Sequence, residues 1–412
     1  VASGLLISFL VLAGNLSGLL VFKLGTKVDE NWWNWLVATG IDLKNNPKLD
    51  VYRPFQVAFF TCIGLNASWA LAKRGGLQAI FFLVLATLFA LLQNIVGVVT
   101  AKLLGVAPLL GVICGAVTLT GGHGTATGFA DEFIKAGMTN AKEIGMAAAT
   151  FGLIAGGLLG GSLGGALIRK NKLQPTVSAE THLEMGANGE PGIWNDFKRL
   201  KSFRGKWILH LLLILVCIKL GAWISYFMQQ LTIPMPMVKA SFSPAFDFAV
   251  SFEKQKLSFP TYIGAMLLGV VLRNIFDAAG VRWIKTEVVD VFASVSLGIF
   301  LTIAMMSLSL IDLAAVAKPM VVILLVQIMV MALFAWFVIF RAMGRDYDAA
   351  VMAGGHCGFG LGATSNAIAS MKTLVENFGP APRAFLIIPI VGAFLIDFPN
   401  ALIITLFLNL AK

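Results

Sequence analysis

Two short stretches of small and hydroxyl-bearing residues hold most of the groups in this chain that could bind a ligand. One reads TLTGGHGTATG over 118–128 and the other AGGHCGFGLGATSNAIAS over 353–370. Their Gly-Gly-His cores, at 121–123 and 354–356, are offset by 233 positions. Backbone N–H groups of a glycine-rich turn, together with the start of the following helix, can bind a carboxylate without an arginine. Neither stretch contains Arg or Lys, so we expect backbone amides and hydroxyl groups to form the site.

The predicted ligand-binding residues are the glycines and polar residues of these two stretches. Those of the first stretch are Thr118, Thr120, Gly121, Gly122, His123, Gly124 and Thr125. Those of the second are Gly354, Gly355, His356, Gly358, Gly360, Thr364, Ser365 and Asn366. The alternative is that the glycines only permit tight helix packing, but their recurrence at a matching position favours a site. The two histidines are weak candidates for metal ligands, because no set of carboxylates or cysteines at metal-ligand spacing accompanies them. Neutral side chains that shape the turn are favoured over proton carriers.

Asp397 is the one acidic residue deep in the last apolar segment. A carboxylate within a membrane is costly and is therefore a functional candidate, and Asn400 lies three residues further on the same helix face. The predicted Na⁺ ligands, which combine these two residues with oxygens of two broken spans, are Gly64, Asn66, Thr302, Asp397 and Asn400. The alternative is that Asp397 pairs with Lys219 and has a structural role only.

The composition indicates which class of protein must position these residues. The chain has 58% hydrophobic and 13% charged residues and a mean hydropathy of +0.85, which is typical of a polytopic membrane protein. The net charge of +10 does not indicate nucleic-acid binding, because the basic residues cluster beside apolar segments as the positive-inside rule predicts. The four cysteines lie in apolar or glycine-rich runs without metal-ligand spacing, so they are expected to be buried thiols.

Nine apolar segments are long enough to cross a bilayer as helices, which need about 20 residues each. They lie at about 4–24, 54–72, 78–104, 143–168, 207–231, 258–276, 289–313, 319–342 and 383–410. Two of them contain candidate breaks, at FFTCIGLNAS (59–68) and IFLTIAMMSLS (299–309). The predicted fold is an all-α polytopic membrane protein.

The spans divide into two halves around a basic segment. Residues 1–168 form a first repeat with a re-entrant hairpin at about 106–130, residues 169–206 a cytoplasmic basic linker, and residues 207–412 a second repeat with a hairpin at about 347–371. With the linker inside, the C-terminus is periplasmic and the hairpins enter from opposite sides. Gln93 and Gln327, 234 positions apart, occupy matching places, as expected of inverted-topology repeats. The second repeat begins with one extra span, so we expect one further span before Val1.

Several long strings along the chain resemble the bacterial sodium/glutamate symporter family. They are FFTCIGLNAS, TLTGGHGTA, ATFGLIAGG, DAAVMAGGHCGFGLGAT and FLIIPIVGAFLIDFPNALII, in this order. The resemblance implies a transporter, not an enzyme, that drives L-glutamate uptake with Na⁺ as a co-transported ion. It also implies a multi-pass protein of the bacterial inner membrane, with ten helices in two inverted repeats, two re-entrant hairpins and an elevator-type homodimer.

Three other functions compete with this interpretation. The first is a Na⁺- or H⁺-coupled carrier of another anion, such as a 2-hydroxycarboxylate. The second is an ion channel lined by the two hairpins, which the absence of a charged ring in those stretches disfavours. The third is a membrane-embedded hydrolase, which is disfavoured because the sequence has no HExxH motif.

Overall fold

The structure, a computed structural model, describes residues 53–175, 206–230, 232–241, 247–256, 260–280, 283–306 and 316–410. The helices of the first half are α3 (Arg53–Asn66), α4 (Trp69–Leu103), α5 (Pro108–Val112), the π-helix η1 (Ile113–Val117), α6 (Gly122–Lys135) and α7 (Ala141–Asn171). The predicted span at 4–24 and most of the predicted linker lie outside the described residues.

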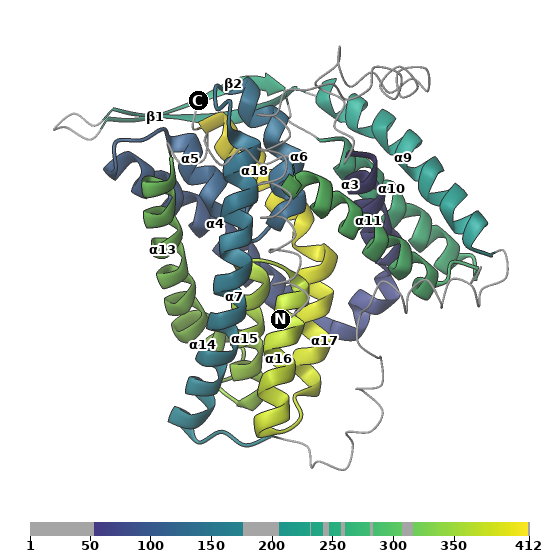
Figure 1. The fold of residues 1–412 in the computed structure, drawn as a ribbon, viewed down its shortest axis with the longest axis vertical. Coiled ribbons are helices and arrows are strands. Elements are labelled where there is room, and N and C mark those ends of the chain that lie inside the picture. Colours follow the sequence, from purple (N-terminus) through teal and green to yellow (C-terminus); the bar gives the residue numbers. More distant parts are fainter. Residues whose placement is uncertain are drawn as a thin grey trace, which may run out of the picture.

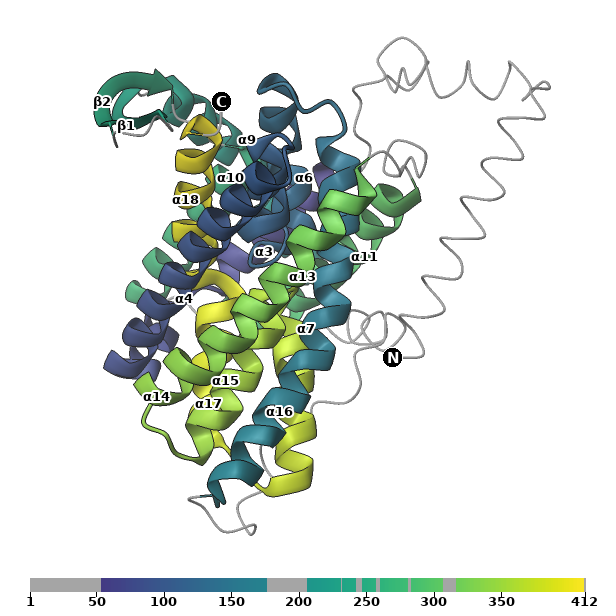
Figure 2. The same ribbon diagram turned by 90° about the vertical axis from the view of Figure 1, so that its left-hand side faces the viewer.

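The second half is also helical, apart from one pair of strands. Its elements are α9 (Lys206–Gln230), β1 (Thr232–Ser241), β2 (Asp247–Lys256), α10 (Thr261–Ala278), α11 (Thr286–Met306), α13 (Ala317–Phe334), η3 (Ala335–Ile339), α14 (Phe340–Ala342), α15 (Tyr347–Gly360), α16 (Thr364–Phe378), α17 (Pro382–Ile390), η4 (Val391–Leu395) and α18 (Asp397–Leu410). β1 and β2 pair antiparallel in the predicted outer loop and lie near the C-terminal end of α18 (Figures 1 and 2).

Six helices of the described part are long and apolar enough to span a membrane, so the chain is a multi-pass membrane protein. They correspond to the predicted spans at 78–104, 143–168, 207–231, 258–276, 289–313 and 319–342. The predicted spans at 54–72 and 383–410 do not count among them because each is interrupted. The predicted number of nine spans therefore stays a prediction. The break predicted at 299–309 was wrong over its described part, because α11 is a continuous helix to Met306.

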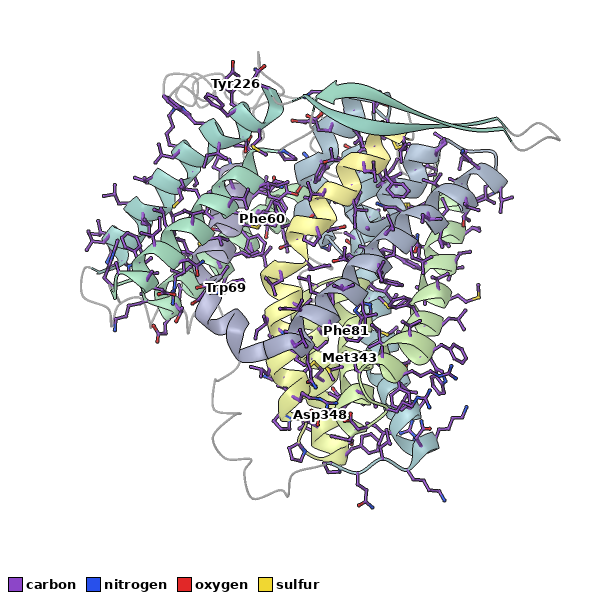
Figure 3. The ribbon with its side chains drawn as sticks, turned by 180° about the vertical axis from the view of Figure 1, so that it is seen from behind. Phe60, Trp69, Phe81, Tyr226, Met343 and Asp348 are labelled. Carbon is purple, nitrogen blue, oxygen red and sulfur yellow. The ribbon has the colours of Figure 1, made fainter. Side chains whose placement is uncertain are left out.

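The predicted break in the first interrupted span lies between α3 and α4. Ala67 and Ser68 are not helical, and Gly76 adopts φ 60° and ψ −160° within α4. Only glycine takes such a backbone conformation without a steric penalty, so the chain turns twice within ten residues. Figure 3 follows this crossing from Phe60 in α3 past Trp69 to Phe81 in α4.

The last segment is interrupted near its middle. Pro389 lies inside α17, and the π-helix η4 follows α17 directly. A proline within a helix removes a backbone hydrogen bond, and its ring clashes with the carbonyl group one turn earlier. A π-helical turn is a second recognised cause of a bend in a helix. α18 then begins at Asp397, which places this carboxylate in the first turn of a helix.

The described helices form two groups, visible in Figure 1. The lateral group consists of α3, α9, α10 and α11, in which α10 packs against both α3 and α9, and α11 packs against α3. The hairpin group consists of α4 to α7 with η1 and of α13 to α18; α15 packs against α7 and α16, and α6 packs against α7. Figures 1 and 2 show α6 towards the end of the molecule with the strands and α16 towards the opposite end.

Candidate functional site

The two Gly-Gly-His stretches each form a helix–turn–helix, and their turns meet. Tip 1 (118–122) joins η1 to α6, and tip 2 (361–363) joins α15 to α16. Gly122 has φ +65°, and a Cβ placed on it would lie 2.8 Å from the carbonyl oxygen of Gly362. The sequence separates these residues by 240 positions, so the fold brings together the two stretches that the sequence singles out.

Two helices begin at the meeting point of the tips. α6 starts at Gly122 and α16 starts at Thr364. The first N–H groups of a helix lack partners within it, and the helix dipole makes this end partly positive. The two helix starts therefore offer unbonded N–H groups and partial positive charge to one small region. Such an arrangement can bind a carboxylate without a basic side chain.

Gln93 of α4 connects the two tips through its side-chain amide. Its Nε2 donates to the carbonyl oxygen of Gly360 at 2.8 Å, and its Oε1 accepts from Thr120 Oγ1 at 2.6 Å. Gln327 donates from Nε2 to the backbone oxygen of Gln93 at 2.6 Å. All three side chains are buried. One glutamine thus ties tip 1 to the end of α15, while its counterpart in the second half holds the backbone of α4.

A second polar contact holds the first arm of the hairpin at 106–130. Asn94 Oδ1 accepts from the backbone N–H of Ala116 at 2.9 Å, and Asn400 Nδ2 donates to the carbonyl oxygen of Ala116 at 3.2 Å. The N–H of Ala116 needs a side-chain acceptor because Gly115 departs from helical geometry, with φ −100° and ψ −135°; the carbonyl oxygen of Ala116 also accepts from the backbone N–H of Gly121 at 2.9 Å. The oxygen of the Asn400 amide is buried and has no hydrogen-bond partner among the described residues.

Helix α7 forms one wall beside the tips. His123 Nε2 lies 3.0 Å from Thr150 Oγ1, and Asn366 Nδ2 donates to the carbonyl oxygen of Leu153. A stripe of glycines on α7 faces α15: a Cβ on Gly156 would lie 3.0 Å from the carbonyl oxygen of Cys357, and one on Gly160 would lie 2.6 Å from that of Gly354. Such small residues allow close backbone contact between membrane helices.

The predicted ligands within α15 lie in packing positions. Three of the glycines each face one neighbour: Gly354 faces Gly160, Gly355 faces Met371 and Gly358 faces Ala367. His356 is buried among four aromatic rings, and its ring nitrogens have no hydrogen-bond partner among the described residues. These contacts agree with the alternative of packing glycines, and a binding role for these four residues stays a prediction.

The remaining predicted ligands differ in what their side chains contact. Thr118 donates to the carbonyl oxygen of Ile113 and Thr364 to that of Gly392. Thr125 is buried, whereas Ser365 is exposed in the first turn of α16. Ser365 is thus the predicted hydroxyl with most freedom to reach a ligand.

The predicted Na⁺ ligands fall in two places. Gly64 and Asn66 end α3 in the lateral group, where Asn66 Nδ2 donates to Asp290 Oδ1 at 2.6 Å. Asp397 and Asn400 begin α18 in the hairpin group. Thr302 is exposed on α11, and its hydroxyl donates to the carbonyl oxygen of Gly298. Lys219 is also exposed. Among the described residues, no cluster of three His, Cys, Asp or Glu could hold a metal ion.

The lateral group reaches the hairpin group through aromatic residues set against glycines of α6. The ring of Phe60 lies 2.6 Å from a Cβ placed on Gly124, and the ring of Tyr262 occupies the space of a Cβ on Gly128. The centroids of the Phe60 and Tyr262 rings are 4.3 Å apart. Gln56 Nε2 donates to the carbonyl oxygen of Gly124 at 2.8 Å. Helix α6 therefore meets these two rings with glycines, and the ring of Phe129 also contacts Tyr262 edge to face.

Comparison with known proteins identifies the family. The family model for the sodium/glutamate symporter matches residues 34–245 and 237–380. The chain belongs to the sodium/glutamate symporter family. It is 39% identical over 358 residues to the sodium/glutamate symporter of Escherichia coli K12, covering 87% of this chain and 82% of that protein. It is 36% identical over 370 residues to that of Haemophilus influenzae, covering 90% and 84%. No solved structure matches the chain.

Within this symporter-family chain, one catalytic motif occurs by coincidence. Residues 160–164 read GGSLG, which fits the GxSxG pattern of serine hydrolases. That motif requires a sharp turn between a strand and a helix. Ser162 instead lies inside α7, and its hydroxyl bonds to the carbonyl oxygens of Leu158 and Leu159.

Sequence reasoning missed several contacts of the symporter-family site. The sequence places Gln93, Asn94 and Gln327 inside apolar segments, where polar side chains commonly link helices, and the structure shows such links. Sequence reasoning gave no role to Thr150 or Phe60. Neither has a local signal, because a threonine or a phenylalanine inside an apolar helix is ordinary.

Proposed function

We propose that this chain is a secondary active transporter that couples the uptake of L-glutamate to the entry of Na⁺ across the bacterial inner membrane. Its family and the printed names of its relatives support the substrate and the ion. The observation that carries the proposal is the convergence of the starts of α6 and α16 at two touching tips. Two helix starts that lack basic side chains suit a small dicarboxylate better than a large or cationic substrate.

In this proposal the carboxylates of glutamate accept hydrogen bonds from the first N–H groups of α6 and α16. The exposed hydroxyl of Ser365 adds a donor, and Asn366 is held against α7 by its bond to Leu153. Gln93 keeps the tips together by bonding Thr120 and Gly360. Because most of these donors are backbone groups of helices, few side-chain rotamers must be ordered on binding.

Na⁺ would offset the negative charge of the substrate. Its proposed ligands are oxygens: Asn66 Oδ1 and Asn400 Oδ1 are both buried without a hydrogen-bond partner among the described residues. The carboxylate of Asp397 starts the same helix turn as Asn400. Unpaired buried oxygens are costly, and a cation that binds them would remove that cost. Gly64 and Thr302 complete the proposed set.

The proposed ion sites can be tested by Na⁺-dependent thermal stabilisation of the purified protein. We expect Asn400→Leu to abolish the rise in Tm with NaCl, measured against choline chloride. The control is Asn377→Leu, since Asn377 is exposed and bonds only within its own helix. An unchanged Na⁺ response in Asn400→Leu would remove Asn400 from the site.

We further propose an elevator-type movement between two inverted repeats in a homodimer. The lateral group, with α9 and α10 of the second repeat, would be the static scaffold at the dimer interface, and the hairpin group would slide along it. The linker is placed in the cytoplasm and the C-terminus in the periplasm, as the positive-inside rule implies. The glycines of α6 under Phe60 and Tyr262 suit sliding, because they leave little side-chain volume at this contact.

Glutamate uptake into proteoliposomes tests the main proposal. We expect uptake to require an inward Na⁺ gradient and to collapse when the gradient is dissipated. Malate, citrate and aspartate are added as competitors, and stronger inhibition by a 2-hydroxycarboxylate than by glutamate would assign another substrate. Uptake that is indifferent to Na⁺ would end the proposal.

The movement is tested at α6. Gly128→Ala places a methyl group where the ring of Tyr262 lies, whereas Gly161→Ala on α7 meets no atom within 4 Å. We expect Gly128→Ala to lower uptake severalfold while glutamate still stabilises the purified protein, and Gly161→Ala to leave both unchanged. Equal uptake by the two variants would contradict sliding at this face.

A further inference from the structure

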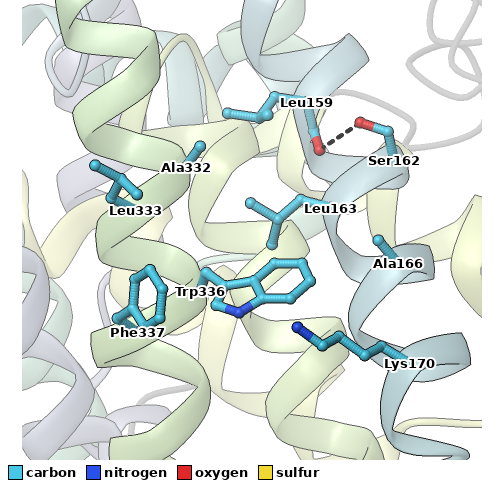
Figure 4. A pocket seen from close by; sticks show the side chains of 9 residues that line it. All are labelled: Leu159, Ser162, Leu163, Ala166, Lys170, Ala332, Leu333, Trp336 and Phe337. Carbon is cyan, nitrogen blue, oxygen red and sulfur yellow. Dashed lines mark hydrogen bonds between the residues drawn. The ribbon is translucent and has the colours of Figure 1, made fainter.

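An apolar groove lies between α7 and the helical segment formed by α13 and η3. Its volume is about 520 Å³, within the range of small-molecule sites. Leu159 and Leu163 of α7 line one side, and Leu333 and Phe337 line the other (Figure 4). Leu163 is buried at the floor, whereas Leu333 and Phe337 are about half exposed. The groove therefore opens outward from the hairpin group.

Small residues and a helix distortion create this groove. Ser162 and Ala166 contribute little volume on α7, and Ala332 is their counterpart on α13. The helix then becomes π-helical over Ala335–Ile339, which carries Trp336 into the lining. Ser162 bonds its own helix backbone, so it leaves no free hydroxyl for a polar ligand. The body of the groove accordingly suits a hydrocarbon chain.

One end of the groove is basic and aromatic. The ammonium of Lys170 lies 5.1 Å from the ring of Trp336 (Figure 4), and the guanidinium of Arg341 lies 5.3 Å from the ring of Phe337. Neither cation forms an ion pair with another described residue. Lysine and tryptophan side chains together are typical of the depth where lipid headgroups lie.

We propose that this groove binds an anionic phospholipid, with an acyl chain between α7 and α13 and the phosphate at Lys170. Basic pockets between membrane helices attract lipid headgroups of negative charge, and a half-exposed apolar groove in a bilayer is filled by hydrocarbon. A second copy of the chain is a poorer occupant. A two-fold contact centred on the basic end of the groove would bring two copies of Lys170 and of Arg341 close together, and like charges repel.

The test is native mass spectrometry of the purified full-length chain titrated with phosphatidylglycerol and, separately, with phosphatidylcholine. We expect tighter binding of phosphatidylglycerol. Lys170→Gln should weaken phosphatidylglycerol binding about fivefold, as expected for one basic residue near a headgroup, and leave phosphatidylcholine unchanged. Lys172→Gln is the matched control, because Lys172 is exposed at the same end of α7 but does not line the groove.

Filling the groove tests the acyl-chain part. Ala166→Trp should reduce the binding of both lipids. An equal loss of phosphatidylglycerol affinity in Lys170→Gln and Lys172→Gln would show a diffuse electrostatic attraction to the surface and would overturn the headgroup site. Unchanged lipid binding in Ala166→Trp would show that the lipid does not bind in this groove. That conclusion would hold whether or not the substitution also disrupts a dimer. Since Lys170 is exposed, its substitution tests the proposal even if Ala166→Trp fails to fold. Lipid binding is measured on the purified protein without a transport assay, so this result is independent of the proposed function.

Discussion

Replacing Gln93 with leucine should loosen the two tips from each other. The substitution removes the bonds from Gln93 to Gly360 and to Thr120 and leaves both partners buried. Hydrogen bonds between membrane helices contribute about 0.6 kcal/mol on average and up to about 1.7 kcal/mol, and a buried group left without a partner adds to the loss. We therefore expect the free energy of unfolding to fall by about 2 kcal/mol.

The same substitution should weaken glutamate binding. Since about 1.4 kcal/mol corresponds to a factor of ten, a loss of about 2 kcal/mol expressed wholly in binding would raise the KM about thirtyfold. Part of the loss affects only the stability of the fold, so we expect the KM for glutamate uptake into proteoliposomes to rise about tenfold. Thr120→Val removes only one of the two bonds and should cost about half as much. Thr87→Val is the control, because Thr87 is on the same helix and its hydroxyl bonds only to Leu83.

A double-mutant cycle isolates the bond itself. Gln93→Leu and Thr120→Val, alone and combined, should show a coupling of about 0.6–1.7 kcal/mol in the free energy of unfolding. Strict additivity, within about 0.3 kcal/mol, together with an unchanged KM in Gln93→Leu, would refute the idea that Gln93 joins the tips.

Three further substitutions test other contacts. Gly122→Ala adds a methyl group 2.8 Å from the carbonyl oxygen of Gly362 at a positive φ; we expect it to cost about 1 kcal/mol or more and to abolish uptake. Gly160→Ala should lower the Tm by several degrees because it separates α7 from α15, whereas Gly161→Ala should not. Arg383→Gln breaks a half-exposed ion pair with the carboxylate that caps α15; we expect a loss below about 1 kcal/mol that shrinks in 1 M NaCl.

The sequence predicted the pieces of the site that have a local signature. Glycine runs are unusual in apolar segments, and two runs at a constant offset indicate a repeated element. The break after Asn66 follows from the polar and small residues of 63–68. These features depend on neighbouring residues only, so composition and spacing are sufficient to locate them.

The contacts between distant segments could not be predicted in the same way. Asn66 bonds Asp290, 224 residues away, and this depends on how α3 packs against α11. The strand pair at 232–256 forms in a segment predicted only as an outer loop. It was not predicted because the stability of each strand depends on the other strand. The break before α18 was not predicted, although Pro389 is a local signal for it, and only the fold places Asn400 against Ala116.

The base of the hairpin formed by α15 and α16 is fastened more firmly than that of the other hairpin. Asp346 caps α15 and pairs with Arg383 of α17 at 2.6 Å, and Asp348 accepts from the backbone of Ala384 at 3.1 Å. Both arms of that hairpin are regular helices. The first arm of the other hairpin is a five-residue helix followed by a distorted π-helix. Since a short, irregular arm has fewer backbone bonds to break, we expect tip 1 to move when the tips separate to admit a substrate.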